Sequence, residues 1–184
     1  TDTQSFLRDF QGSNRYILNY LVDEVLAMQP EDVQHFLLHT AVLDRLSVPL
    51  CNAVTGRSDG YRLLDHLVES NLFIVPLDDA GQWYRYHHLF SDVLRHRLQL
   101  QSPEAVPQLH QRASRWFEAQ GMIEQALDHA LAAEDMNRAG SLLAAISRDL
   151  LKHGNVLTLE TWLDALPADR ISSSPDLSLA YGWL

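Results

Sequence analysis

The chain has 184 residues, of which 46% are hydrophobic and 21% charged, and its formal net charge is -10. This is the composition of an ordinary globular protein with one domain or two small ones, and an acidic chain is a poor candidate for binding the phosphates of nucleic acids. No apolar run approaches the roughly 20 residues that cross a bilayer, and residues 1–12 lack the apolar segment of a signal peptide.

The spacing of apolar residues predicts helices through residues 13–70. The first begins at Ser13 or Asn14 and ends at Pro30, which opens the second, over 31–43, with acidic residues in its first turn. A short helix over 47–54 is closed by Gly56, and a fourth covers 60–70. The residues expected on the apolar faces are Ile17, Tyr20, Leu21, Val25, Met28, Val33, Phe36, Leu37, Leu63, Leu64, Leu67 and Val68.

The period then changes to that of a β-hairpin. The runs "LFIVPL" and "WYRY" are rich in β-branched and aromatic residues, and the turn signal "DDAGQ" separates them. Pro76 must lie where its missing N–H faces no partner. Helical spacing resumes over 88–98, with Phe90, Val93, Leu94 and Leu98. Short helices, a hairpin and a further helix predict a winged-helix domain over 13–100.

The stretch "QSPEAVP" holds two prolines and is predicted to be a junction, and the chain after residue 104 is predicted to be entirely helical. Helices over 109–120, 122–135, 137–153 and 156–166 are separated by Gly121 and Gly154, and the last stops at Pro167. Paired helices of this length favour an α-solenoid. Gly121, Ala126 and Ala133 have the spacing of the small residues in tetratricopeptide repeats. The expected fold is therefore mainly α: a winged helix with a hairpin wing, followed by a tetratricopeptide-like solenoid segment.

Both ends of the chain resemble truncation points. The opening residues lack an initiator Met, and "SPDLSLAYGWL" begins a helix and then stops. We therefore expect a fragment of a longer protein. The single cysteine, Cys51, cannot form an internal disulfide, which favours a cytoplasmic location.

Neither a metal site nor a catalytic site is expected. Adjacent residues on a helix point about 100° apart, so His87 and His88 are poorly placed to share a metal. His35 and His39 have the i, i+4 spacing of a metal pair, but no further ligand completes the site. The sequence has no Gly-x-Ser-x-Gly turn and no Walker-type phosphate loop. We expect that the chain itself is not an enzyme.

Direct reading of DNA by this module is also disfavoured. The helix in the recognition position offers Arg62 and His66, but Asp59, Asp65 and Glu69 accompany them. Carboxylates that face phosphates are repulsive. The basic run "RHRL" at 95–98 is better explained as a solvated helix end.

One histidine remains with two interpretations. His87 follows the aromatic run Trp83, Tyr84 and Tyr86, which is expected to pack in the wing and core, and it stands at a helix start. A histidine there can donate an N–H to a phosphate. Alternatively, the histidine caps its own helix, and from the residues alone this capping role is the favoured interpretation.

A resemblance bears on this choice. The pattern "FQGSNRYILNYLVDEVL" through "ESNLFIVPLDDAGQWYRYHHLFSDVLR" to "LHQRASRWFEAQGMIEQALDHALAAED" resembles the middle of the MalT-like bacterial transcription activators, over roughly residues 10–150. These are ATP-dependent signal-transduction NTPases (the STAND class) with a LuxR-type DNA-binding domain. The resemblance implies that residues 1–12 are a linker from a nucleotide-binding region. It also implies that 101–184 hold a helical arm and the start of a tetratricopeptide-like sensor.

The resemblance also implies a role for His87. The wider class carries a Met-His-Asp motif at the end of its winged helix, and the histidine contacts the β-phosphate of ADP. Here "YHHL" places Tyr86, His87 and His88 at those positions, so His87 is the expected nucleotide contact, whereas His88 departs from the acid. With this resemblance the nucleotide contact becomes the favoured interpretation.

The expected function is that of a regulatory middle segment of an inducer-responsive activator. The full-length protein would be a signalling ATPase that binds ATP or ADP, whereas the fragment alone would hold no cofactor. Its expected partners are its own P-loop and sensor domains, an inducer bound by the sensor, and further copies upon activation. DNA would be bound only by a separate C-terminal helix-turn-helix, and no membrane is involved. The alternative is a protein–protein interaction scaffold without a nucleotide role.

Overall fold

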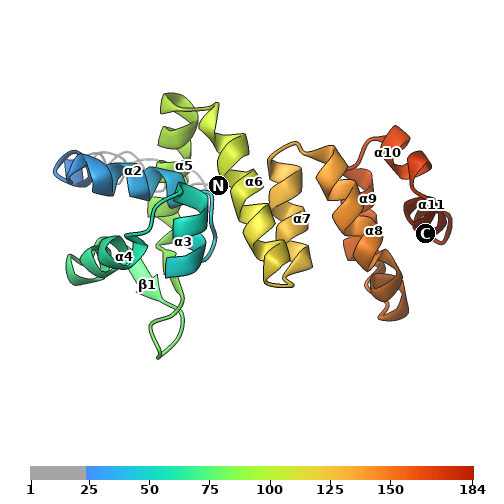
Figure 1. The fold of residues 1–184 in the computed structure, drawn as a ribbon, viewed down its shortest axis with the longest axis horizontal. Helices are drawn as coiled ribbons and strands as arrows, with labels where there is room; N and C mark the ends of the chain where they lie inside the picture. The colour runs from blue at the N-terminus through green and yellow to red at the C-terminus, as the bar shows by residue number, and fades with distance from the viewer. Residues whose placement is uncertain (1–23) are drawn as a thin grey trace, which may run out of the picture. The chain divides into compact units, whose positions relative to one another are not determined.

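The computed structural model describes residues 24–184 (Figure 1). The chain divides into two compact units between Pro103 and Glu104. The expected linker over 1–12 and most of the helix predicted from Ser13 or Asn14 lie outside the described residues. At the described end of that helix the prediction for Met28 is wrong: Leu26 is buried, and Met28 is 75% exposed. Two residues apart on a helix point to nearly opposite sides, so burying one exposes the other.

The first unit begins with three short helices: α2 (Glu31–Thr40), α3 (Val48–Thr55) and α4 (Gly60–Glu69). The acids predicted in the first turn of α2 lie there. At the start of α3, the hydroxyl of Ser47 accepts a hydrogen bond from the Leu50 N–H, and α3 ends at Gly56 in the left-handed conformation, with φ 72°. All three helices confirm the predicted elements.

An antiparallel hairpin, β1 (Ile74–Pro76) and β2 (Tyr84–Tyr86), forms the wing. Its turn is held by Asp78, whose carboxylate accepts hydrogen bonds from the backbone N–H of Gln82 at 2.8 Å and of Trp83 at 3.0 Å. The hairpin is thus confirmed, and its turn residues are those that the sequence signalled.

The position of Pro76 is explained by a third extended segment. Pro76 lies opposite Tyr84. Both backbone groups of Tyr84 turn away from it to Leu46, with N–O distances of 2.8 and 2.9 Å. The missing N–H of Pro76 therefore leaves no acceptor unsatisfied, as predicted. The bridge at Leu46 was not anticipated.

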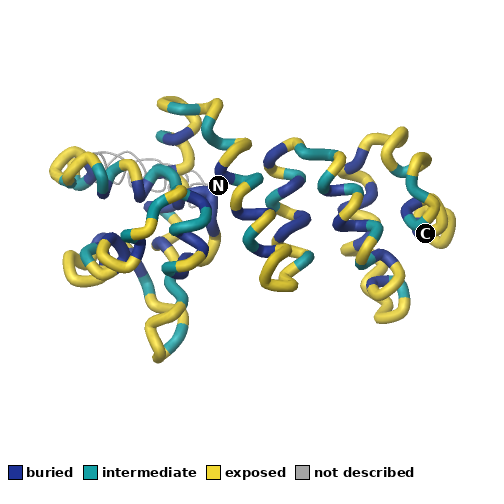
Figure 2. The backbone as a smooth tube through the Cα atoms, viewed as in Figure 1, coloured by how far each residue is buried: buried dark blue, intermediate teal, exposed yellow. Residues whose placement is uncertain are grey.

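Helix α5 (His88–Gln101) follows the wing and completes the core of the first unit. Phe90, Leu94 and Leu98 lie buried along one face of α5, and Phe36 and Leu63 are fully buried from α2 and α4. Figure 2 shows how buried and exposed residues alternate along the helices. The prediction for Val68 is wrong: it is 42% exposed. The buried face of α4 is centred on Leu63, Leu64 and Leu67 and excludes it.

The second unit is entirely helical. Its helices are α6 (Ala105–Ala119), α7 (Ile123–Ala132), α8 (Met136–Lys152), α9 (Val156–Asp164), α10 (Ala168–Ser173) and α11 (Pro175–Gly182). Each of α6, α7 and α8 packs against the helix that follows it. Gly121 and Gly154 end helical turns with a positive φ of 75°. The predicted helices are present, and α10 was not anticipated.

Small residues bring α6 and α7 close together. Ala126 and Ala130 are fully buried, and the buried Ser114 hydroxyl donates to the Ala126 carbonyl at 2.6 Å. Further along, the indole N–H of Trp162 on α9 donates to Asp128 on α7 at 3.0 Å. These contacts explain the small residues, whereas the tetratricopeptide-like character of the unit stays a prediction. Among residues 24–184, no helix has both the length and the apolar character needed to cross a membrane.

Candidate functional site at the start of helix α5

The candidate site is built on Tyr86, the last residue of β2. Its side chain is buried, and its hydroxyl lies 2.7 Å from the hydroxyl of Thr40 on α2. Burial raises the pKa of Tyr86 well above its usual value, so the phenol stays neutral. Its ring meets Phe90 edge-on, with centroids 5.7 Å apart. Tyr86 thereby fixes the point where the chain leaves the wing.

The backbone of the next residue, His87, is held on both sides. Its N–H donates to the carbonyl of Phe73 at 2.7 Å, and its carbonyl accepts from the N–H of Ser91 at 3.0 Å. The first bond ties it to the segment before β1, and the second belongs to the first turn of α5. The backbone position of His87 is therefore defined by two separate elements.

The side chain of His87 is exposed. It occupies the N-cap position of α5 but makes no capping hydrogen bond. Its ring lies against that of His88, with centroids 4.4 Å apart and an interplanar angle of 33°. The alternative that His87 caps its own helix is therefore wrong. The imidazole is free to meet a group from outside the described residues, and the nucleotide contact stays a prediction.

His88 lies beside a small hollow of about 170 Å³. The hollow is lined by Leu43, Asp44, Arg85, Tyr86, His88, Ser91, Asp92 and Arg95. Arg95 is engaged there, since it donates to the Ala41 carbonyl at 2.8 Å and pairs with Asp44 at 2.7 Å. His88 stands where the resembled motif has an acid. The hollow also contains the carboxylate of Asp92, one turn further along α5.

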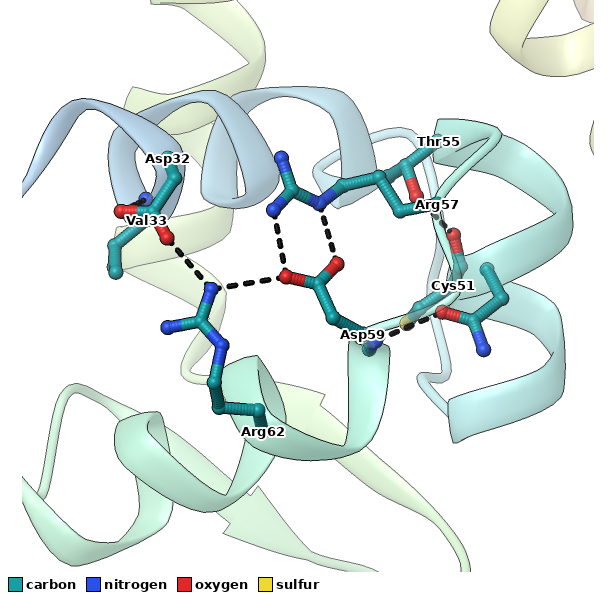
Figure 3. A network of polar contacts seen from close by, with 9 residues as sticks. Asp32, Val33, Cys51, Thr55, Arg57, Asp59 and Arg62 are labelled. Carbon is teal, nitrogen blue, oxygen red and sulfur yellow. Dashed lines mark hydrogen bonds and ion pairs between the residues drawn. The ribbon is translucent and has the colours of Figure 1, made fainter.

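Ion pairs surround the start of α4, the helix in the recognition position (Figure 3). Arg62 pairs with Asp32 at 2.7 Å and with Asp59 at 2.9 Å, and Arg57 makes two hydrogen bonds of 2.7 Å to Asp59. The two guanidinium groups hold the pKa of Asp59 well below its usual range. Because Arg62 is already neutralised, this geometry argues against phosphate contacts from α4.

His35, His39 and Cys51 are the other residues that the sequence singled out. The rings of His35 and His39 lie 3.7 Å apart. Within residues 24–184, no group of three or more His, Cys, Asp or Glu side chains is arranged to hold a metal ion. Cys51 is buried, and burial raises the pKa of its thiol to about 12. A thiol of this kind is not a nucleophile at neutral pH.

Two features near the site escaped the sequence analysis. The Thr40–Tyr86 hydrogen bond joins residues 46 positions apart, and periodicity carries no signal for such a pair. Phe73 adopts a positive φ of 52°, which is unusual for a bulky residue. The only local sequence signal is Asn71 two positions earlier, a residue that tolerates the left-handed conformation at a helix end.

A comparison with protein families bears on this region. Residues 22–106 match the family model of the MalT winged helix domain. The match covers α2 to α5, the wing and residues 86–88. It supports a MalT-like winged helix in this part of the chain, and with it a segment of a MalT-like regulator of transcription.

Proposed function

We propose that this chain is the regulatory middle segment of an ATP-dependent, inducer-responsive transcription activator of the cytoplasm. In this proposal it couples the nucleotide state of a P-loop domain to a sensor and to a LuxR-type DNA-binding domain carried elsewhere in the full-length protein. The match of residues 22–106 to the MalT winged helix domain supports the assignment. The nucleotide and the inducer are part of the proposal.

One observation carries the nucleotide role. The imidazole of His87 is exposed and makes no cap to its own helix, while its backbone is fixed by hydrogen bonds to Phe73 and Ser91. An imidazole N–H on a fixed backbone is a good donor to a phosphate, because the backbone needs no further ordering when the ligand binds. ADP bound by the P-loop domain would meet this donor.

The proposed mechanism is a balance between two states. ADP that contacts both the P-loop domain and His87 stabilises a closed, inactive monomer. ATP and an inducer bound to the sensor stabilise an open form, which associates with further copies and activates transcription. Each ligand shifts the balance only by its difference in affinity for the two states. His87 supplies part of that difference for ADP.

The test compares wild type with His87→Ala in the full-length protein. The purified proteins are denatured, and the released ADP is quantified. We expect wild type to carry ADP and His87→Ala to lose most of it, or to activate transcription without inducer. His88→Ala is the matched control, because His88 is also exposed and its ring lies against that of His87. Equal ADP retention and equal inducer response in all three proteins would rule out the nucleotide role.

A second candidate function is a protein–protein scaffold. It is favoured by exposed apolar side chains on α11, where Leu179 is 55% and Tyr181 is 56% exposed. In that case full-length His87→Ala retains ADP and keeps its inducer response, whereas Tyr181→Ser loses a partner protein. The same pair of variants therefore separates the two functions.

A further inference from the structure

The loop between α4 and β1 holds an unusual backbone conformation next to the candidate site. Asn71 and Phe73 both have a positive φ, 51° and 52°, and the buried Leu72 lies between them. Asn71 ends α4 in the usual way, since the next N–H, that of Leu72, returns to the Leu67 carbonyl at 2.9 Å. Phe73 does not end a helix, and its left-handed conformation is strained because the Cβ atom of a bulky residue is disfavoured there.

Two contacts to the start of α5 stabilise the strained conformation of Phe73. Its carbonyl accepts the N–H of His87 at 2.7 Å. Its ring stacks on Phe90, with centroids 5.0 Å apart and an interplanar angle of 27°. One residue thus holds the first turn of α5 at two points, the backbone of the N-cap and a core ring three residues later. Strained residues of this kind persist where the surroundings fix them, and they cluster at functional sites.

We propose that Phe73 is the positioning residue for His87. Its left-handed backbone aims the carbonyl at the His87 N–H, and its stacked ring keeps the carbonyl there. The backbone from which the exposed imidazole of His87 projects is thereby held in place, although the side chain makes no capping hydrogen bond to α5. This inference rests on the proposed function for its consequence, the retention of ADP, but its geometric content is independent of any nucleotide.

The first experiment measures hydrogen exchange at the His87 amide in the present chain. In Phe73→Ala the strained conformation is no longer held by a ring. In Phe73→Gly the positive φ costs nothing, but the carbonyl is no longer fixed. We expect exchange at His87 to rise by roughly tenfold in both variants, the scale of one lost backbone hydrogen bond. Phe73→Tyr keeps the ring and should exchange like wild type.

Two controls separate positioning from general destabilisation. The Tyr84 amide donates to Leu46 in the same wing and should keep its protection in all variants, because that bond does not involve Phe73. Leu77→Ala removes a side chain from the same wing with an exposure of 42%, close to the 37% of Phe73, and should leave the His87 amide unchanged. Equal loss at His87 and Tyr84, or unchanged exchange at His87 in Phe73→Gly, overturns the positioning role.

The second experiment measures ADP released from the full-length protein. Phe73→Ala should lower retention as His87→Ala does, and the double variant should be no worse than His87→Ala alone, because the two residues act through one contact. If His87 exchange rises in Phe73→Ala but His87→Ala retains ADP, positioning stands and the nucleotide role fails. If Phe73→Ala retains ADP that His87→Ala loses, the nucleotide role stands, and Phe73 does not position His87 for the nucleotide.

Discussion

At the scale of single residues, four charged side chains of the first unit form one cluster of ion pairs. Asp59 pairs with Arg57 and Arg62, and Arg62 also pairs with Asp32. These contacts join the start of α2 to the start of α4. Exposed ion pairs of this kind contribute modestly and are screened by salt. Their main consequence is a defined dependence of stability on pH.

We predict that Asp59→Asn removes stability at neutral pH but not in acid. Hydrogen bonds from Arg57 and then Arg62 lower the pKa of Asp59 below its ordinary value of 3.8. A carboxylate with a lowered pKa in the folded state contributes stability above its unfolded pKa and loses it as the pH falls through the folded value. Thermal unfolding should therefore show a lower Tm for Asp59→Asn at pH 7, with the difference shrinking below about pH 4.

The control for this prediction is Asp79→Asn. Asp79 is exposed in the wing turn and makes no ion pair with any residue of the described chain. Its replacement should change the Tm little, and equally at each pH. A difference for Asp59→Asn that is the same at pH 7 and pH 3 would contradict the ion-pair explanation.

At the scale of elements, apolar periodicity predicted most of the fold. The helices, the hairpin and its turn follow from local signals, such as Gly56 after α3 and Asp78 in the wing turn. What local signals could not give is contact between distant residues. The bridge of Leu46 to Tyr84 and the Thr40–Tyr86 hydrogen bond depend on how elements meet in space. For the candidate site, the sequence placed His87 at the helix start but could not tell whether its ring caps that helix.

Two glycines of the helical unit should respond oppositely to alanine. Gly140 lies within α8, where an added Cβ would meet only the Leu177 side chain at 3.9 Å, an ordinary contact. Gly140→Ala should stabilise by about 0.5–1 kcal/mol, because alanine is the better helix former. Gly121 has a φ of 75° with nothing within 4 Å of the added Cβ, so its replacement is strained for backbone reasons alone. Gly121→Ala should destabilise by about 1–2 kcal/mol.

Urea unfolding followed by circular dichroism measures both changes in the free energy of unfolding. The two variants add the same methyl group, so each is the control for the other. If Gly140→Ala were destabilised, the space between Gly140 on α8 and Leu177 on α11 would be too small for a Cβ atom, contrary to the 3.9 Å separation.

At the scale of the whole molecule, the net charge of -10 disfavours binding to the phosphates of nucleic acids. We predict that it does not bind duplex DNA of random sequence at physiological salt, although residues 22–106 match a winged helix. The one arginine of α4, Arg62, is already paired with two carboxylates, and the net negative charge repels phosphate. Fluorescence anisotropy with a labelled duplex measures this. Binding tighter than about 10⁻⁴ M, the weak end of non-specific binding, would contradict it.

The wing has one further consequence, which concerns how copies of the protein meet. In an antiparallel ladder the backbone N–H and C=O groups of alternate residues point away from the partner strand. The backbone groups of Ile74 and Pro76 therefore face the open side of β1. Proline has no N–H to offer a passing strand, and the opposite side of β2 is already taken by Leu46 at Tyr84. Strand addition to this sheet is therefore disfavoured. If the activated protein assembles, its subunits must be joined by side-chain surfaces rather than by a shared sheet through the wing.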